Sequence, residues 1–159
     1  MMLKRNQSAR GAFPRWPPTI ALTGRGKCRH DLPGADRPPV AIVLIVEDEP
    51  FIRQVAEWTI GDLGHATLMA DDMASALDHL DGQQPIDALF VDIHLYAESQ
   101  GGYEIARRAV GMRPELRVLY TSGTSLCTDM TDRFIAGAAF IQKPYTTAQL
   151  EHSIELLLH

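Results

Sequence analysis

From residue 40 onward, short apolar runs alternate with segments whose apolar positions recur every three or four residues. The first run, Val40–Val46, is uninterrupted, as expected of a strand that is covered on both faces. Five such runs predict strands at 41–46, 66–70, 88–91, 116–120 and 138–141. The helical spacing predicts helices at 50–64, 73–80, 103–112, 125–136 and 146–158. The apolar stripe of the first helix is Phe51, Val55, Trp58, Ile60 and Leu63.

This regular alternation predicts an α/β fold, a doubly wound five-stranded parallel sheet with helices on both faces. We expect the flavodoxin-like strand order 2-1-3-4-5, in which strands one, three, four and five are neighbours. Ligands of such sheets bind at the carboxyl ends of the strands. The residues that follow each strand are therefore the candidates for chemistry.

Acidic, hydroxyl and amine side chains follow four of the five predicted strands. They are Glu47, Asp48 and Glu49 after the first, Asp92 after the third, Thr121 and Ser122 after the fourth, and Lys143 after the fifth. With the expected strand order, these groups converge on one pocket. Clustered carboxylates repel one another, and Mg²⁺ relieves that repulsion because it prefers carboxylate and phosphate oxygens. We therefore expect a site for Mg²⁺ and a phosphoryl group.

Each of these residues also has an ordinary structural interpretation when taken alone. Glu49 suits the start of a helix, where its charge interacts favourably with the helix dipole. Asp48 and Asp92 are each as well explained as helix caps, and Lys143 as a plain loop lysine. The combination of these chemistries at four strand ends is what favours a site.

The charge of the chain is unevenly distributed. Residues 1–39 hold eight basic and two acidic residues, a net charge of +6, whereas residues 40–159 hold seven basic and eighteen acidic residues, a net charge of −11. The acidic part repels phosphate backbones, so we expect no nucleic-acid binding by the folded domain. Residues 1–39 are rich in proline and lack apolar periodicity. We expect a disordered basic extension there and a folded domain at 40–159.

The role of the extension is left open by the sequence. It suits a transit-like leader, a tether to an anionic surface, an arm for nucleic acid, or residues with no role that precede the true start. No apolar core follows its basic start, so it is not a secretory signal. The longest apolar run of the chain has seven residues, far fewer than the roughly 20 of a membrane span. The cysteines, Cys28 and Cys127, form no disulfide or metal motif, so we expect a cytoplasmic protein.

Four segments carry a resemblance to a known family: Val46-Glu-Asp-Glu-Pro50, Leu89-Phe-Val-Asp-Ile93, Tyr120-Thr-Ser122 and Phe140-Ile-Gln-Lys-Pro-Tyr145. Asp48 and Asp92 are 44 residues apart, Asp92 and Thr121 are 29 apart, and Thr121 and Lys143 are 22 apart. Segments and spacings together resemble the receiver domain of bacterial two-component response regulators. The resemblance covers about residues 41–159.

The resemblance implies a phosphoacceptor and a metal site. Asp92 resembles the phosphoacceptor, and Asp48 the residue that binds Mg²⁺ directly. Glu47 resembles the second acid of the pair, which acts on Mg²⁺ largely through water. His94 would offer its backbone carbonyl to the metal.

The resemblance also implies a switch. Lys143 resembles the lysine that binds the phosphoryl group, and the Lys143–Pro144 peptide is cis in many relatives. Thr121 resembles the switch hydroxyl, which moves toward the phosphoryl group, and Phe140 resembles the aromatic residue that follows it inward. Slow attack by water would reset the switch, so we expect a weak self-phosphatase activity and not an enzyme in the ordinary sense.

The partners implied are a sensor histidine kinase or a histidine phosphotransfer protein, and a downstream protein target. The target would bind the surface formed by 125–136, 138–141 and 146–158, including Asp132, Arg133, Gln142 and Tyr145. A homodimer is left open. No output domain is expected, because the chain ends one helix after Lys143.

Several residues depart from the family pattern. The segment directly after Asp92 contains no proline, and Gly101 and Gly102 come one or two residues later than the usual glycine. We therefore expect a longer, reshaped loop at 93–102, with Tyr96 and Glu98 overhanging the pocket. Ser122 and Gly123 stand where alanine is common next to the switch residue, and Phe140 lacks the hydroxyl of the usual tyrosine.

Three alternatives fit parts of the sequence. A phosphatase of the haloacid-dehalogenase type also uses an aspartyl phosphate, but it has a second aspartate where this chain has His94. A flavin-binding protein would need a phosphate loop after the first strand, where three acids stand here. A receiver-like module that binds partners without phosphorylation is the third alternative.

Overall fold

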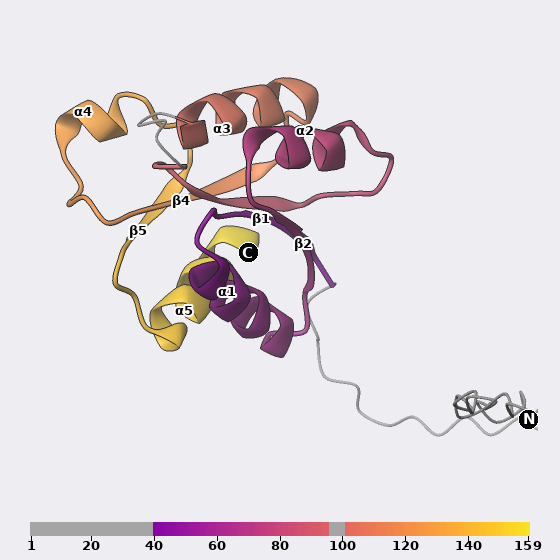
Figure 1. Ribbon diagram of the computed structural model, residues 1–159, viewed down its shortest axis with the longest axis horizontal. Helices are drawn as coiled ribbons and strands as arrows, with labels where there is room; N and C mark the ends of the chain where they lie inside the picture. Colours follow the sequence, from indigo (N-terminus) through magenta and orange to yellow (C-terminus); the bar gives the residue numbers. More distant parts are fainter. Residues whose placement is uncertain (1–39, 96–100) are drawn as a thin grey trace, which may run out of the picture. The chain divides into compact units, whose positions relative to one another are not determined.

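The computed structural model describes residues 40–95 and 101–159, so the expected extension at 1–39 and the expected overhang of Tyr96 and Glu98 lie outside the described residues. Strands and helices alternate along the described chain (Figure 1). The strands are β1 (Ile42–Val46), β2 (Ala66–Ala70), β3 (Ala88–Asp92), β4 (Arg117–Ser122) and β5 (Ala139–Gln142). The helices are α1 (Pro50–Asp62), α2 (Met73–Asp81), α3 (Gly101–Met112), α4 (Thr128–Thr131) and α5 (Thr147–Leu158).

The five strands form one parallel sheet in the order β2-β1-β3-β4-β5. In Figure 1, α1 and α5 lie on one side of this sheet, and α2 and α3 lie on the other. The predicted doubly wound α/β fold and its strand order are confirmed. The register pairs Val46 with Val91 and Asp92 with Thr121, so the neighbouring strands end at one edge.

Side chains of the central strands alternate between the two faces of the sheet. Val43 and Ile45 pack in the cluster that includes α1 and α5 residues, whereas Leu44 and Val46 pack in the cluster that includes α2 and α3 residues. Every residue of β3 is buried. Burial on both faces explains why these strands read as uninterrupted apolar runs and not as alternating ones.

Several strands continue past their last apolar residue. β3 was predicted to end at residue 91 and β4 at residue 120, but they end at Asp92 and Ser122. The reason is that the backbone ladder continues: Asp92 pairs with Thr121, and Ser122 with Gln142. Polar residues of the candidate site are thus held by the sheet itself. The other boundaries match the predicted ones or differ from them by at most two residues, except those of α4.

The predicted apolar stripe of α1 is wrong in part. Phe51 is 73% exposed and Trp58 is 63% exposed, whereas α1 buries Ala56, Thr59 and Ile60. Thr59 tolerates burial because its hydroxyl donates to the carbonyl of Val55 at 2.8 Å. Hydrophobicity alone could not distinguish the two faces, because both carry apolar residues.

The predicted helix at 125–136 is also wrong, since α4 spans only Thr128–Thr131. After α4 the chain turns, and Phe134 stacks on Tyr120 with 4.5 Å between ring centroids. Phe134 and Ile135 pack against the larger apolar cluster. Tertiary packing of these two residues replaces the further helical turns that the weak pattern predicted.

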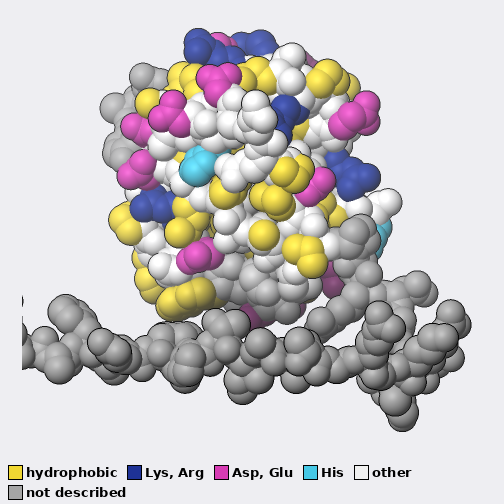
Figure 2. Space-filling view, turned by 90° about the vertical axis from the view of Figure 1, so that its right-hand side faces the viewer, with side chains coloured by type: hydrophobic (Ala, Val, Ile, Leu, Met, Phe, Trp, Pro, Cys, Tyr) yellow, Lys and Arg dark blue, Asp and Glu magenta, His cyan; other side chains and the backbone are white. Residues whose placement is uncertain are grey.

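Figure 2 shows the side of the domain on which β2 forms the sheet edge; acidic, basic and hydrophobic side chains are interspersed there. Among the described residues, no helix has the length and the apolar composition required to cross a membrane.

Candidate functional site

The candidate site lies where β1, β3, β4 and β5 end. Glu47 follows β1 directly, Asp92 is the last residue of β3, Thr121 is in the last two residues of β4, and Lys143 follows β5. Parallel strands bring these positions together because all their carboxyl ends meet at one edge. Glu47, Asp92 and Thr121 are all at least nine-tenths buried.

The Lys143 amine bridges two carboxylates. Its Nζ donates to Asp92 Oδ2 at 2.6 Å and to Glu47 Oε2 at 2.7 Å. The Lys143 side chain is 15% exposed, and the two carboxylates are less exposed still. The Lys143 backbone is fixed as well, because its N–H donates to the carbonyl of Ser122 at 2.8 Å. The peptide between Lys143 and Pro144 is cis.

Burial shifts the proton affinities of this group. Desolvation raises the pKa of Glu47 from 4.5 to about 7, although the hydrogen bond from Lys143 opposes the shift. For Lys143, burial alone lowers the pKa, but its hydrogen bonds with Asp92 and Glu47 outweigh burial, and the net shift of its pKa is upward. Lys143 therefore stays cationic beside the two acids.

Three carboxylates are arranged as a potential metal site. One oxygen of each of Glu47, Asp48 and Asp92 lies within 4.8 Å of the others. Two of these residues are buried and Asp48 is half-buried. Hard oxygen donors at this spacing, close to one lysine, suit Mg²⁺, which binds through one or two carboxylates and keeps several waters. The residues present therefore fit the expected ion.

The side chains of Glu49 and His94 are not part of this carboxylate cluster. Glu49 is exposed and occupies the N-cap position of α1, where its side chain makes no capping hydrogen bond. The His94 backbone N–H donates to Asp92 Oδ1 at 3.0 Å. The His94 imidazole lies 3.1 Å from the Ser122 hydroxyl, measured from Nδ1, and is not among the grouped metal ligands.

Thr121 presents a buried hydroxyl without a hydrogen-bond partner among the described residues. Thr121 is fully buried and is paired in register with Asp92 on the neighbouring strand. An unsatisfied buried hydroxyl costs about 1–3 kcal/mol. A ligand oxygen on Asp92 would supply the missing acceptor, so the donor set also suits a phosphoryl group.

Phe140 belongs to a series of aromatic rings beside the site. It is half-buried and lies 6.0 Å from Phe134 between ring centroids. Phe134 stacks on Tyr120, and Tyr120 lies 5.6 Å from Tyr103 of α3. Because Tyr120 immediately precedes Thr121, these rings connect the site to α3 and to the segment after α4.

The role of Gly102 was not predicted from the sequence. A Cβ atom on residue 102 would lie 2.1 Å from the backbone oxygen of Asp92, which is far too close. The Gly102 N–H also donates to the carbonyl of Ile93 at 3.2 Å. The start of α3 therefore packs directly on the backbone of Asp92. The signal in the sequence was the pair of glycines at the end of the expected loop.

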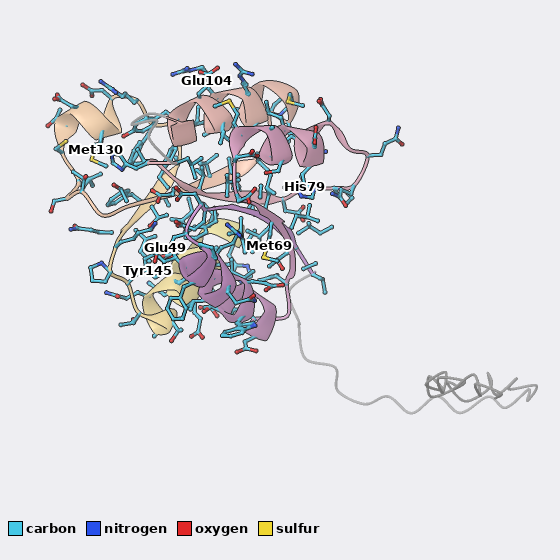
Figure 3. All side chains as sticks on the ribbon, viewed as in Figure 1. Glu49, Met69, His79, Glu104, Met130 and Tyr145 are labelled. Atoms are coloured by element: carbon cyan, nitrogen blue, oxygen red, sulfur yellow. The ribbon has the colours of Figure 1, made fainter. Side chains whose placement is uncertain are left out.

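An apolar groove of about 500 Å³ opens next to Lys143. The residues that line it are Phe51, Ile52, Val55, Gly123, Lys143, Pro144 and Tyr145. Figure 3 labels Tyr145 and Glu49 near the start of α1. Tyr145, which we expected on the target-binding surface, is half-buried, and its ring contacts Phe90 edge to face at 6.2 Å. It also lines the groove beside α1, and its place on the target-binding surface stays a prediction.

Comparisons with known proteins point to a single family. The model of the response regulator receiver domain matches residues 43–155. The chain is 26% identical over 117 residues to the response regulator receiver protein CpdR of Brucella abortus, covering 73% of this chain and 95% of CpdR. A solved response regulator receiver protein from Sinorhizobium medicae superposes with a TM-score of 0.68 at 25% identity, covering 76% of this chain and 95% of that one.

A second curated relative is much longer than the region it shares. The sensory transduction protein LytT of Enterococcus faecalis is 36% identical over 73 residues, which are 45% of this chain and 29% of LytT. The similarity to LytT is thus confined to less than a third of that protein.

Proposed function

Because the chain belongs to the response regulator receiver family of two-component signalling, we propose that it is a phosphoacceptor switch whose acceptor is Asp92. The observation that carries the proposal is the contact of Lys143 Nζ with Asp92 Oδ2 at 2.6 Å, next to the buried, unpartnered hydroxyl of Thr121. An amine in contact with the carboxylate and a hydroxyl on the paired residue of the neighbouring strand are the donors that a phosphorylated aspartate requires.

In the proposed reaction, a carboxylate oxygen of Asp92 attacks the phosphorus of a phosphohistidine on a histidine kinase or phosphotransfer protein. The P–N bond breaks as the P–O bond forms, and the leaving imidazole takes up a proton. Mg²⁺ held by Asp48, Glu47, Asp92 and the backbone carbonyl of His94 would offset the repulsion between the reacting anions. Lys143 pairs with a phosphoryl oxygen.

The phosphorylated state differs in charge and in hydrogen bonding. A phosphoryl group adds a charge of about −1.5 to −2 near neutral pH. The Thr121 hydroxyl then gains an acceptor, and its movement frees space into which Phe140 turns. Both changes bias an existing equilibrium between two conformations and require no new fold. Attack of water on the aspartyl phosphate resets the switch, the self-phosphatase activity expected above.

Two surfaces suit the two partners. The groove beside α1 adjoins Lys143, and the exposed Phe51 at its rim provides an apolar contact for the phosphodonor. The surface of α4, β5 and α5 would carry the signal to a downstream protein; Asp132, Arg133 and Gln142 are exposed there. Because Phe134 and Phe140 stack within this region, a shift of Phe140 would alter the surface directly.

Phosphotransfer tests the proposal. The purified protein is mixed with histidine kinases from its host that have been phosphorylated in advance, and transfer of the label is followed with time. We expect rapid transfer from one kinase or phosphotransfer protein, dependent on Mg²⁺. A protein that takes no label from any of them, and none from a small phosphodonor, would instead be a partner-binding module without phosphorylation.

A further inference from the structure

A short series of hydrogen bonds links the proposed acceptor to the loop after β4. Asp92 Oδ1 accepts from the backbone N–H of His94 at 3.0 Å. The imidazole Nδ1 of His94 lies 3.1 Å from Ser122 Oγ. Ser122 Oγ also accepts from the backbone N–H of Thr124 at 3.0 Å. The loops that follow β3 and β4 are therefore joined through one buried hydroxyl.

The direction of the bond between Ser122 and His94 follows from the number of donors and acceptors. Ser122 is fully buried, so its O–H proton needs an acceptor. Its oxygen already accepts from Thr124, and among the described residues the acceptor within reach is the His94 ring nitrogen. The hydroxyl therefore donates to Nδ1, and the ring proton of neutral His94 resides on Nε2. This bond fixes both the tautomer and the orientation of the exposed imidazole.

The position of Ser122 gives this bond a consequence for switching. Ser122 follows Thr121 directly, and in this structure the Thr121 hydroxyl has no partner among the described residues. A movement of Thr121 toward a phosphoryl group on Asp92 carries the neighbouring backbone with it. Ser122 is tied to the loop after β3 through its hydrogen bond with His94, so a shift of the backbone at Thr121 and Ser122 would have to stretch or break this bond.

We propose that Ser122 and His94 form a latch that holds the loop after β4 in the unphosphorylated arrangement, an inference that rests on the proposed phosphorylation of Asp92. Opening the latch is part of what phosphorylation must do. The latch belongs to this chain and not to the receiver pattern as a whole, because it requires a serine after the switch residue and a histidine two positions after the acceptor.

Binding of beryllofluoride in the presence of Mg²⁺ tests the latch, since this anion occupies an aspartate as a phosphoryl analogue does. We expect Ser122→Ala and His94→Ala each to bind beryllofluoride about two- to ten-fold more tightly than the wild type, the range for one neutral hydrogen bond. The double variant should bind no more tightly than Ser122→Ala, because the bond to His94 is already absent there. Ser125→Ala is the matched control, since this serine lies in the same loop but accepts from Gln142 instead.

Equal or weaker binding by Ser122→Ala, or fully additive effects in the double variant, would overturn the latch while leaving the proposed function intact. Absence of binding by the wild type would overturn the proposed function itself. A second measurement needs no phosphorylation: imidazole nitrogen NMR of the neutral histidine ring, recorded in alkaline buffer. We expect the Nε2–H tautomer for His94 in the wild type and a mixture in Ser122→Ala; a predominant Nδ1–H form in the wild type would contradict the latch.

Discussion

Lys143 and Asp92 are 51 positions apart in the chain, yet the lysine Nζ lies 2.6 Å from the aspartate Oδ2. The same amine lies 2.7 Å from Glu47 Oε2. A single lysine that follows β5 therefore links the residues at the ends of β1 and β3. Because the three groups are largely buried, removal of the lysine would leave two buried acids without their cationic partner. This arrangement leads to five testable predictions, which concern the charges of the site, its metal, its packing and its phosphorylation.

The first prediction concerns the pH dependence of stability in metal-free protein. Glu47 has a pKa of about 7 when folded, against 4.5 as its ordinary value. Between these values the folded state binds a proton that the unfolded state has lost. The free energy of unfolding therefore falls as the pH rises from about 4.5 to 7. Glu47→Gln should remove this component and gain stability, on the order of a few kcal/mol, at about pH 8.

Urea unfolding in the presence of a chelator, repeated across this pH range, measures the effect. Glu49→Gln is the control, because Glu49 is exposed and its side chain makes no capping bond. A slope in Glu47→Gln equal to that of the wild type would show that burial of Glu47 is not the cause.

The second prediction concerns metal binding. Asp48→Asn removes one charged ligand of the acidic cluster, and we expect Mg²⁺ affinity to fall at least about tenfold. Isothermal titration calorimetry measures it, and the melting temperature provides a second reading. At a concentration of 100 times its Kd, a bound Mg²⁺ should stabilise the wild type by about 2.7 kcal/mol. Stabilisation of Asp48→Asn equal to that of the wild type would place the ion elsewhere.

The third prediction concerns the unpartnered hydroxyl of Thr121. Thr121→Val has a similar shape and removes a buried hydroxyl that has no described partner. Unphosphorylated Thr121→Val should be as stable as the wild type, or up to about 1 kcal/mol more stable. Its phosphorylated form should lack the conformational change, which NMR of the Phe140 region detects. Wild-type spectral changes in phosphorylated Thr121→Val would remove Thr121 from the switch.

The fourth prediction concerns the contact of α3 with Asp92. Gly102→Ala would place a Cβ 2.1 Å from the Asp92 carbonyl oxygen, so the backbone of Asp92 must shift. We expect a loss of about 3 kcal/mol in the free energy of unfolding, together with slower phosphorylation. Gly111→Ala lies in the same helix with nothing within 4 Å of the added atom. It should gain up to about 1 kcal/mol. Equal effects of the two substitutions would contradict the close contact.

The sequence predicted the sheet and its order because buried parallel strands appear in a sequence as uninterrupted apolar runs, separated by segments with helical spacing. It placed the boundaries of β3 and β4 too early, because Asp92 and Thr121 are polar while their backbone pairing continues. The periodicity could not assign the faces of α1, since Phe51 and Trp58 are as apolar as Ile60 but are exposed. Which apolar face is covered depends on α5 and the sheet, and not on α1 alone.

For the candidate site, the sequence could predict only which residues lie at the ends of the strands. Carboxyl ends of parallel strands converge, so acids, a hydroxyl and an amine after four strands indicated one pocket. Contacts made by close packing could not be predicted from the sequence in this way. Gly102 abuts Asp92 through the backbone, and Ser122 meets His94 across two loops. Both depend on the path of the chain after β3, which has no periodic signal.

The central claim is that Asp92 accepts the phosphoryl group. The most direct measurement is the stoichiometry of acid-stable, base-labile phosphate after incubation with phosphoramidate and Mg²⁺, for the wild type, Asp92→Asn and Asp87→Asn. Asp87 immediately precedes β3 at its opposite end, where its carboxylate accepts from the backbone of Ile42. We predict about one phosphoryl group per chain in the wild type and in Asp87→Asn, and none in Asp92→Asn. Labelling of Asp92→Asn to the level of the wild type would contradict the account.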